Sequence, residues 1–331
     1  MTKDIQLCAI GNGIVDLQFY INDDELAQLN VKKSEMKLID YQEAELLKEY
    51  AKSHKFHQIS GGSAANSIIA FSKMGGKGAF ITVLGNDDFG KFYAKEFEEL
   101  GIILKAEFID TLPTGLCFIF ITPDSERTML TYLGATSNIS AQHINEDIIS
   151  RSEWIYLEGY LFSQENSADA LYKAIEISKK NNTKISLTFS DAFITENFRE
   201  NINKIIPDCD LIFCNENEAR SFTGEKTSDI AIDKLFSKVP NAIITKGNKG
   251  SIIKWNGDIY EIPSYPASPI DATGAGDMFA GAFLYGIITL SNPMLAGHLA
   301  SLSAAKVVSQ MGARMSADYD EIKHQIYKGK I

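Results

Sequence analysis

The sequence predicts an open α/β sandwich with a mostly parallel central sheet and a small β-sheet lid. Short runs of β-branched or aromatic residues alternate with helical patterns through most of the 331 residues, which is typical of βαβ units. Two regions break this alternation, because strand-like runs follow each other there without an intervening helix. The first observation predicts the parallel sheet, and the second predicts the lid.

The predicted strands of the central sheet are short and apolar. They lie at 7–10, 79–84, 154–157, 185–189, 211–214 and 242–245. Segments with helical spacing separate them, and we predict helices at 64–74, 90–100, 167–180 and 292–310. The apolar run at 278–290 is shorter than the roughly 20 residues that a membrane-spanning helix needs, so it predicts a buried helix.

The two regions that lack helices, 14–39 and 115–133, predict a small antiparallel β appendage. Both flank the first helical units in the sequence. We therefore expect them to form a lid over the carboxyl ends of the central strands, where open α/β folds bind their ligands.

The charge of the chain argues against nucleic acid and membrane partners. Its net charge is −11 and its pI is near 5.0, and the sequence has no local basic patch that would attract phosphate or anionic lipid. The first residues lack the apolar core of a secretory signal, so we expect a cytoplasmic protein. The cysteines show no CxxC spacing and the histidines no HExxH spacing, which argues against a zinc site or a disulfide framework.

The strongest local signal is the motif Asp-Ala-Thr-Gly-Ala-Gly-Asp at 271–277, which the apolar run follows at once. Gly274 and Gly276 let backbone N–H groups converge at the start of a helix, so a phosphate that develops negative charge fits there. Asp277 could accept the proton of a substrate hydroxyl as that oxygen attacks. Alternatively, Asp277 is only a carboxylate that the helix dipole favours.

A second glycine cluster, Gly-Gly-Ser-Ala-Ala-Asn at 61–66, precedes another helical segment. Asn66 can offer a donor and an acceptor to vicinal hydroxyls, while the alternative is an ordinary helix start. The sequence has no GxxxxGK[ST] P-loop, and no GxGxxG motif follows a strand. Without these two motifs, the sequence does not support a Walker-type nucleotide-binding site or a Rossmann dinucleotide-binding site.

Together these motifs resemble the PfkB family of carbohydrate and nucleoside kinases. The clusters at 61–66 and 85–90 resemble the first family signature, and 271–277 resembles the second. Other family pieces appear in the family's order: Gly-Asn-Gly-Ile-Val-Asp at 11–16, Asn-Glu-Asn-Glu at 215–218 and Thr-Lys-Gly-Asn-Lys-Gly at 245–250. The resemblance implies a ribokinase-like three-layer α/β/α sandwich and a single kinase domain over 1–331, with the lid segments at 14–39 and 115–133.

By this resemblance the chain is an ATP-dependent kinase that uses Mg²⁺. Asp277 would be the catalytic base, and Gly274, Ala275 and Gly276 would supply the anion hole. Asn215 and Glu218 would organise the phosphates and, through water, the Mg²⁺. The nucleotide would contact Asn215, Thr245, Lys246, Gly247, Gly250, Gly274 and Gly276. Asp271 and Thr273 match a loop that binds a monovalent cation such as K⁺ in some members.

The resemblance also implies where the acceptor binds. Asp16, Gly61, Gly62 and Asn66 would hold ribose or sugar hydroxyls. By similarity to adenosine kinases, Tyr160 would stack on the base, and Met36 and Leu38 would cover it. The alternative is that these three side chains simply pack the lid against the domain, and that Glu158 binds a sugar hydroxyl.

The choice of acceptor depends on smaller departures from the sugar-kinase pattern. Ile68 stands where sugar kinases usually have a small residue, and the segments at 11–16, 122–129 and 156–160 resemble bacterial adenosine-kinase-like proteins. We therefore predict phosphorylation of adenosine, with a sugar kinase of the ribokinase, fructokinase or 2-keto-3-deoxygluconate kinase type as the alternative.

A third hypothesis is a nucleotide-binding protein that has lost the chemistry, which intact Asp277 and Glu218 disfavour. The expected partners are small nucleosides or sugars. The expected assembly is a monomer or a homodimer through the lid.

Overall fold

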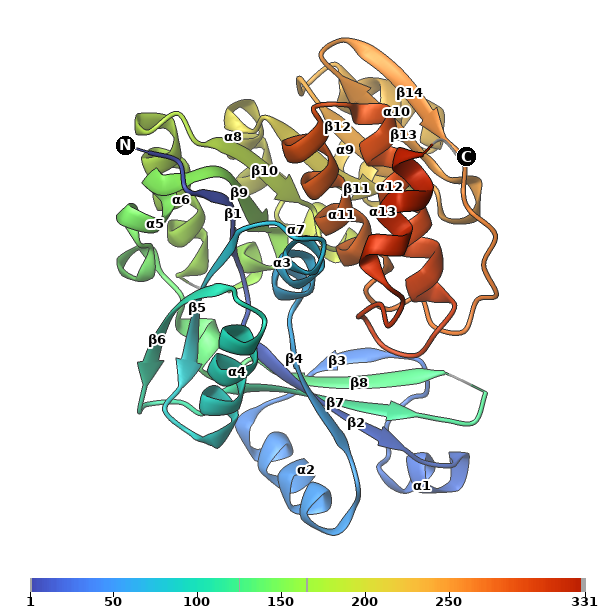
Figure 1. The fold of residues 1–331 in the computed structure, drawn as a ribbon. Helices are drawn as coiled ribbons and strands as arrows, with labels where there is room; N and C mark the ends of the chain where they lie inside the picture. Colours follow the sequence, from blue (N-terminus) through green and yellow to red (C-terminus); the bar gives the residue numbers. More distant parts are fainter. Residues whose placement is uncertain (1, 125, 165, 329–331) are drawn as a thin grey trace.

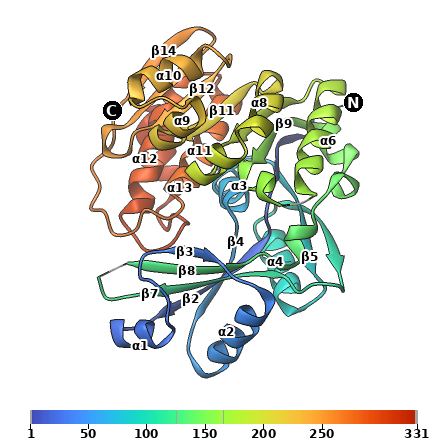
Figure 2. The ribbon, with the colours of Figure 1, turned by 180° about the vertical axis from the view of Figure 1, so that it is seen from behind.

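The computed structural model describes residues 2–124, 126–164 and 166–328. The predicted domain at 1–331 and the motif at 122–129 therefore each include residues outside the described set. The described chain forms a large sheet with helices on both faces, and a smaller sheet beyond one end of it (Figure 1). The view from behind shows the same two parts (Figure 2). The predicted α/β class is confirmed.

Within the described residues, the large sheet has nine strands in the order β14-β13-β12-β11-β10-β9-β1-β5-β6. The pairs from β12 to β6 are parallel, whereas β13 and β14 add an antiparallel edge. The strands are β1 Ile5–Ile10, β5 Gly78–Gly85, β6 Ile103–Ile109, β9 Ser152–Glu158, β10 Lys184–Thr188, β11 Leu211–Asn215, β12 Ala242–Thr245, β13 Ser251–Trp255 and β14 Asp258–Ile262. The six predicted strands are all present, and β6, β13 and β14 were not predicted.

Alternate residues of the central strands face two different cores, which gives the fold its three layers. In β1, Leu7 and Ala9 belong to one buried cluster, while Cys8 and Ile10 belong to the other. The first cluster includes residues of α3 Ser63–Lys73, α4 Asp88–Glu99, α11 Ala275–Leu290, α12 Pro293–Val308 and α13 Tyr319–Tyr327. The second includes residues of α5 Glu146–Arg151, α6 Ser167–Lys180, α7 Ala192–Asn197, α8 Arg199–Ile205, α9 Glu216–Thr223 and α10 Ser228–Phe236.

The predicted helices agree with this arrangement. The helix predicted at 167–180 coincides with α6, and those at 64–74, 90–100 and 292–310 correspond to α3, α4 and α12. The apolar run at 278–290 lies in α11, whose Phe283 and Leu284 are fully buried, as predicted. Short 3₁₀ turns complete the main body: η1 Gly134–Asn138, η2 Ala141–His143, η3 Gly159–Ser163, η4 Ile206–Asp208 and η5 Gly247–Lys249.

The second sheet has the strand order β3-β8-β7-β2-β4. Its strands are β2 Ile14–Tyr20, β3 Met36–Leu38, β4 His57–Gly61, β7 Gly115–Ile121 and β8 Arg127–Tyr132, and α1 Asp23–Gln28 and α2 Tyr41–Ser53 lie in the connections. Both predicted lid segments thus contribute to one sheet, to which β4 adds a strand that the sequence pattern did not reveal.

The prediction that this appendage is antiparallel is wrong. The pairs β2–β7 and β3–β8 are parallel, and only β2–β4 and β7–β8 are antiparallel. Parallel pairing requires a long connection between the strands. Here elements of the main body lie in the sequence between β2 and β7 and between β3 and β8. Only β7 and β8 follow each other directly as a hairpin, so only their pairing is fixed by a turn. The sheet is therefore mixed.

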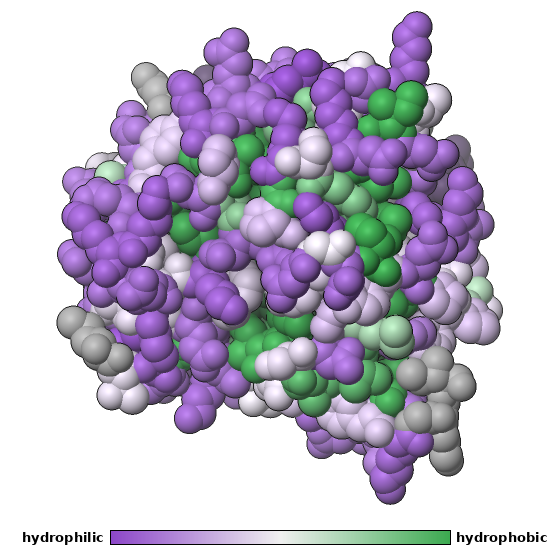
Figure 3. Space-filling model, turned by 90° about the horizontal axis from the view of Figure 1, so that it is seen from above, coloured by the Kyte–Doolittle hydropathy of each residue, from purple (hydrophilic) through white to green (hydrophobic). Residues whose placement is uncertain are grey.

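The outer surface is mostly polar on the face shown from above. Figure 3 shows hydrophilic residues over most of that face, with hydrophobic areas between them. Within the described ranges, no helix has both the length and the apolar character needed to cross a bilayer.

Candidate active site

The start of α11 holds the strongest motif of the sequence. Gly274 caps the helix in a left-handed conformation with φ of 74°, and a Cβ atom there would lie 2.5 Å from the Ala313 Cβ atom. By contrast, a Cβ atom at Gly276 would meet no atom of the described residues within 4 Å. The position beside Gly276 is therefore open, and a ligand atom could approach the backbone there.

The N–H groups at this helix start are only partly available. The Ala275 N–H donates to the Ala272 carbonyl oxygen at 3.2 Å. Helix geometry leaves the N–H groups of Gly276 and Asp277 without an intrahelical acceptor. The anion hole predicted at Gly274, Ala275 and Gly276 thus has its open donors toward the Gly276 end.

Asp277 joins the two glycine clusters of the sequence. Its Oδ2 atom accepts a hydrogen bond from Asn66 Nδ2 at 3.1 Å, and its Oδ1 atom accepts one from Ser63 Oγ at 2.6 Å. The structure therefore brings the predicted residues Asn66 and Asp277 together. Ser63 was not predicted, although its place inside the first glycine cluster was a signal that could have found it.

Burial raises the pKa of Asp277 to about 6, against the opposing effect of the hydrogen bonds from Ser63 and Asn66. The side chain is nevertheless partly exposed, so a substrate hydroxyl can reach it. A carboxylate with this pKa is ionised at neutral pH and can accept a proton.

We expect kcat/KM to fall as the pH drops, because Asp277 must be ionised to act as a base. The acidic limb should have an apparent pKa between those of Asp277, about 6, and Asp16, about 7. Activity should be retained on the alkaline side of the limb. A profile of kcat/KM at constant ionic strength measures this. A rate that stays level down to about pH 5 would contradict a base of this kind.

Asp16 lies on β2 beside the first glycine cluster. A Cβ atom at Gly61 would come within 2.5 Å of the Asp16 Oδ1 atom, so only glycine leaves room for the carboxylate. Gly62 has φ of 105°, and a Cβ atom there would lie 2.0 Å from the Asn12 carbonyl oxygen. The glycines at 61 and 62 thus shape the wall next to Asp16.

Charges from three parts of the chain act on Asp16. Burial raises its pKa to about 7, the positive charges of Arg314 and Arg127 oppose the shift, and the charge of Asp277 adds to it. The charges of Asp16 and Asp277 therefore act on each other, which is consistent with the prediction that both face one acceptor site.

Glu158 lies behind this site. It is 1% exposed, its Oε1 atom accepts from Asn12 Nδ2 at 2.8 Å, and its Oε2 atom accepts from the Ala64 N–H at 3.0 Å. Burial raises its pKa to about 7, and the bonds from Ala64 and Asn12 oppose that shift. These contacts tie the 11–13 turn to the start of α3, where the first glycine cluster lies.

The three residues predicted around a base occupy different surroundings. Tyr160 is partly buried in η3 and packs against the second core cluster, and burial together with nearby carboxylates raises its pKa. Met36 and Leu38 lie on β3 at the edge of the second sheet, where they are 49% and 56% exposed. In this structure the side chains of Met36 and Leu38 are thus exposed at the edge of the second sheet and do not line a closed pocket.

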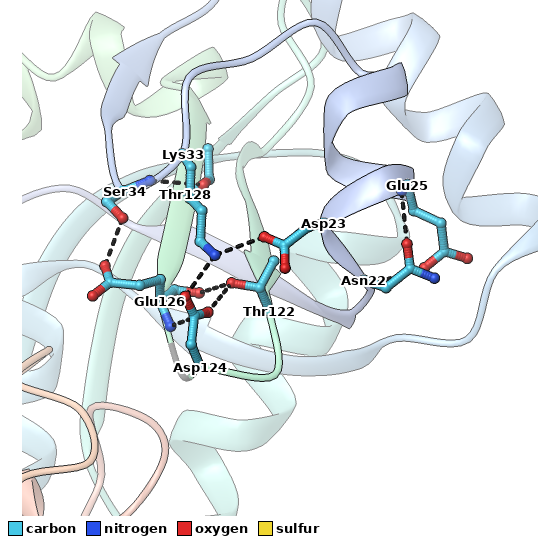
Figure 4. A network of polar contacts seen from close by, with 9 residues as sticks. All are labelled: Asn22, Asp23, Glu25, Lys33, Ser34, Thr122, Asp124, Glu126 and Thr128. Atoms are coloured by element: carbon cyan, nitrogen blue, oxygen red, sulfur yellow. Dashed lines mark hydrogen bonds and ion pairs between the residues drawn. The ribbon is translucent and has the colours of Figure 1, made fainter.

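A polar network holds the chain before β3 against the β7–β8 hairpin (Figure 4). Lys33 Nζ binds Asp23 Oδ1 at 2.7 Å and Asp124 Oδ2 at 2.6 Å. Ser34 donates its hydroxyl to Glu126 Oε2 at 2.5 Å, and its N–H to the Thr128 hydroxyl at 3.1 Å. The two predicted lid segments are joined by this network as well as by strand pairing.

A cavity of about 490 Å³ lies against the other side of the α11 start. Its largely apolar wall includes five of the predicted nucleotide and anion-hole residues, namely Thr245, Gly247, Gly250, Ala275 and Gly276. Lys246 and Gly274 adjoin it in sequence without lining it. Two somewhat larger cavities, of about 550 and 580 Å³, lie beside His143 and beside Tyr41, and Asn86 and Asp87 of the 85–90 cluster also line the second.

Asn215 and Glu218 form a capping box at the start of α9. The Glu218 N–H donates to Asn215 Oδ1 at 2.9 Å, and Glu218 Oε2 accepts from the Asn215 N–H at 3.2 Å. Burial raises the pKa of Glu218 to about 7. Each carboxylate oxygen keeps a second lone pair, so Glu218 still fits a metal-bound water.

Asp271 is engaged by protein donors on both oxygens. Oδ1 accepts from the Thr273 N–H at 2.9 Å, and Oδ2 accepts from the Gly312 N–H at 2.8 Å. Oδ2 also pairs with Arg127 Nε at 3.1 Å. Arg127 was not predicted as a site residue. Among the described residues, no cluster of three or more His, Cys, Asp or Glu side chains forms a candidate metal site.

Comparison with known proteins places this chain in a family. The model of the pfkB family carbohydrate kinases matches residues 28–319. A 5-dehydro-2-deoxygluconokinase of Clostridium perfringens is 28% identical over 312 residues, which cover 88% of this chain and 90% of that protein.

Two solved structures are similar over nearly the whole chain. A "probable sugar kinase protein" from Rhizobium etli has a TM-score of 0.89 and 29% identity, and covers 100% of both chains. The adenosine kinase from Sinorhizobium meliloti has a TM-score of 0.88 and 28% identity, and covers 97% of this chain and 99% of its own. The three-layer fold is therefore that of sugar and adenosine kinases.

Proposed function

Because this chain belongs to the PfkB family of kinases, as the match over 28–319 shows, we propose that it phosphorylates adenosine, a ribose-containing acceptor. The observation that carries the catalytic part is the position of Asp277. It lies between Asp16 and Asn66 on one side and the open backbone of Gly276 on the other. A hydroxyl bound by the first group would face a phosphate bound by the second.

The chemistry proceeds in one displacement. Asp277 accepts the proton of the acceptor's primary hydroxyl, and that oxygen forms a bond to the γ-phosphorus of ATP. The bond between the γ-phosphorus and the bridging oxygen breaks, and ADP leaves with the electron pair. The N–H groups at Gly276 and Asp277 and the dipole of α11 stabilise the negative charge on the transferring phosphoryl group.

We place the ATP in the cavity of about 490 Å³. Its apolar wall suits an adenine ring, and its Thr245, Gly247 and Gly250 come from the loop around η5. Mg²⁺ supplies charge neutralisation between the β- and γ-phosphates when it is bound. Glu218 and Asn215 would orient that ion through water, since Glu218 retains acceptor capacity.

Adenosine is proposed over a free sugar on the basis of local residues, because relatives of similar identity include both kinds of kinase. Tyr160 offers a large aromatic ring near the carboxylates of the site. Glu158, the residue that could instead have bound a sugar hydroxyl, is buried and already accepts bonds from Asn12 and Ala64. Both features favour a base over an extra hydroxyl.

Replacing Tyr160 with alanine tests this choice. A stacked ring contributes about 0.5–1.5 kcal/mol beyond buried area, so the acceptor KM for adenosine should rise by about 2- to 12-fold while that for ribose changes little. Tyr172→Ala is the matched control, because Tyr172 also packs against the second core cluster but lies on α6. Equal losses for adenosine and ribose in Tyr160→Ala would mean that Tyr160 only packs the fold.

Cytoplasmic location and a monomer, or a homodimer through the second sheet, remain predictions of this proposal. The edge strands of the second sheet are β3 and β4. Sizing chromatography with light scattering measures the assembly directly.

A further inference from the structure

Arg127 is a buried cation that reaches from the second sheet to the anion-hole loop. It is the first residue of β8, and its partner across the antiparallel pair is Ile121 of β7. Its side chain is 5% exposed and that of Asp271 is 3% exposed, and Arg127 Nε lies 3.1 Å from Asp271 Oδ2. An ion pair this well buried must be matched in charge, because either charge alone would be costly in a medium of low dielectric.

Asp271 is the point at which this cation acts on the loop. One carboxylate oxygen binds the Thr273 N–H, and the other binds the Gly312 N–H beyond α12. The Asp271 N–H itself donates to the Val308 carbonyl oxygen at 3.2 Å. Asp271 thus fixes the turn that leads directly into Gly274 and Gly276.

The contact between Arg127 and Asp271 is an ion pair and not a hydrogen bond. Both Nε and Nη2 of Arg127 are buried and have no hydrogen-bond partner in the part of the chain that the structure describes, so the guanidinium group retains binding capacity. Its charge also acts on Asp16, whose pKa it lowers against the effect of burial. Arg127 therefore forms an ion pair with Asp271, and its charge also acts on Asp16, which is proposed to bind the acceptor.

A monovalent cation does not fit at Asp271 beside this arginine. Such an ion needs oxygen ligands, and Oδ2 is already shared by the guanidinium group and the Gly312 N–H. Two positive charges a few ångströms apart in a buried site repel each other strongly. The similarity of Asp271 and Thr273 to a K⁺-binding loop thus meets a direct obstacle in this chain.

We propose that Arg127 takes the place of a monovalent cation at Asp271. Its guanidinium group neutralises the carboxylate and fixes the loop that carries Gly274 and Gly276, so catalysis does not require K⁺. Arg127 is a positioning residue, since it acts through Asp271. The inference depends on the proposed role of that loop as the anion hole, but the absence of a K⁺ effect on folding can be tested without any acceptor.

The test compares KCl with choline chloride at equal ionic strength, using thermal unfolding and steady-state kinetics. The wild-type protein should give the same Tm and the same kcat in both salts. Arg127→Gln should lower kcat by about 10²-fold, the effect of a small misplacement, with a smaller change in the KM for ATP. Because this variant leaves Asp271 uncompensated, K⁺ should raise its Tm and restore part of its kcat, whereas choline should not.

Three further variants sharpen the result. Arg127→Lys keeps the charge and should recover part of kcat without any response to K⁺. Arg127→Gln combined with Asp271→Asn removes both buried charges, so it should fold even if the single variant does not, and should ignore K⁺. Arg151→Gln removes an arginine from the exposed pair with Asp4 and should leave activity unchanged.

Two outcomes would overturn the proposal. A saturable rise of the wild-type Tm or kcat with K⁺ would show that a cation binds despite Arg127. A response to K⁺ in the double variant would place the cation away from Asp271. If instead the wild type ignores K⁺ but no acceptor is ever phosphorylated, the kinase assignment fails and the Tm result still stands.

Discussion

Replacing Asp277 with asparagine should lower kcat by about 10²- to 10⁴-fold or more, the range that general-base catalysis contributes. Asparagine keeps the size of the side chain but cannot accept the hydroxyl proton. Its amide oxygen can still accept a bond from Ser63 or Asn66, the partners of the native carboxylate. ATP binding should therefore be nearly unchanged, which calorimetry or fluorescence titration with ATP and the purified variant measures.

The matched control is Asp88→Asn. Asp88 is a carboxylate in the first turn of α4, just as Asp277 is in the first turn of α11, but its side chain is fully exposed and it is not one of the predicted site residues. If Asp277 served only the helix dipole, both variants would behave alike. Near-normal turnover in Asp277→Asn would remove Asp277 from the mechanism.

Replacing Asp16 with alanine should lower the acceptor kcat/KM by up to about 10⁴-fold, the discrimination shown by sites built around a substrate hydroxyl. The carboxylate lies against Gly61, in space that only glycine leaves open. Asp16 is on β2, which pairs with β4 and β7 of the second sheet, so it lies away from the residues proposed to bind ATP. The KM for ATP should change little. Initial rates with each substrate varied in turn separate the two constants.

Asp16→Asn serves as the companion variant, because it keeps the volume and removes the charge. It should retain more activity than Asp16→Ala if the carboxylate accepts hydroxyl hydrogen bonds. An unchanged acceptor KM with weakened ATP binding in either variant would place Asp16 on the nucleotide side.

The fold could be predicted from the sequence wherever local pattern decides structure. Strands such as β5 and β12 are apolar runs between turns, and α6 is an amphipathic segment that ends in lysines, so their periodicity identifies them. The strand β4, with the sequence His-Gln-Ile-Ser-Gly, carries no such pattern and is formed by pairing with β2. The parallel pairing of β2 with β7 likewise depends on contacts between distant segments, which a single sequence does not encode locally.

The same distinction applies to the site. Residues inside the glycine motifs, such as Asn66 and Asp277, could be predicted, and the structure places them in hydrogen-bond contact. Arg127 could not, since it stands in an ordinary strand sequence and meets Asp271 only through the packing of the second sheet on the main body. The motif at 215–218 is ambiguous from sequence because a capping box uses the same residues at the same spacing.

The most direct test of the account is the acceptor specificity of the purified wild-type protein, measured as ADP release with ATP and Mg²⁺. The panel contains adenosine, inosine, guanosine, ribose, fructose and 2-keto-3-deoxygluconate. The Asp277→Asn variant, assayed in the same way, measures the ADP release that does not depend on Asp277. The account predicts that adenosine gives the highest kcat/KM. A higher kcat/KM for ribose, fructose or the keto sugar would contradict the proposed acceptor and assign the site to a sugar kinase.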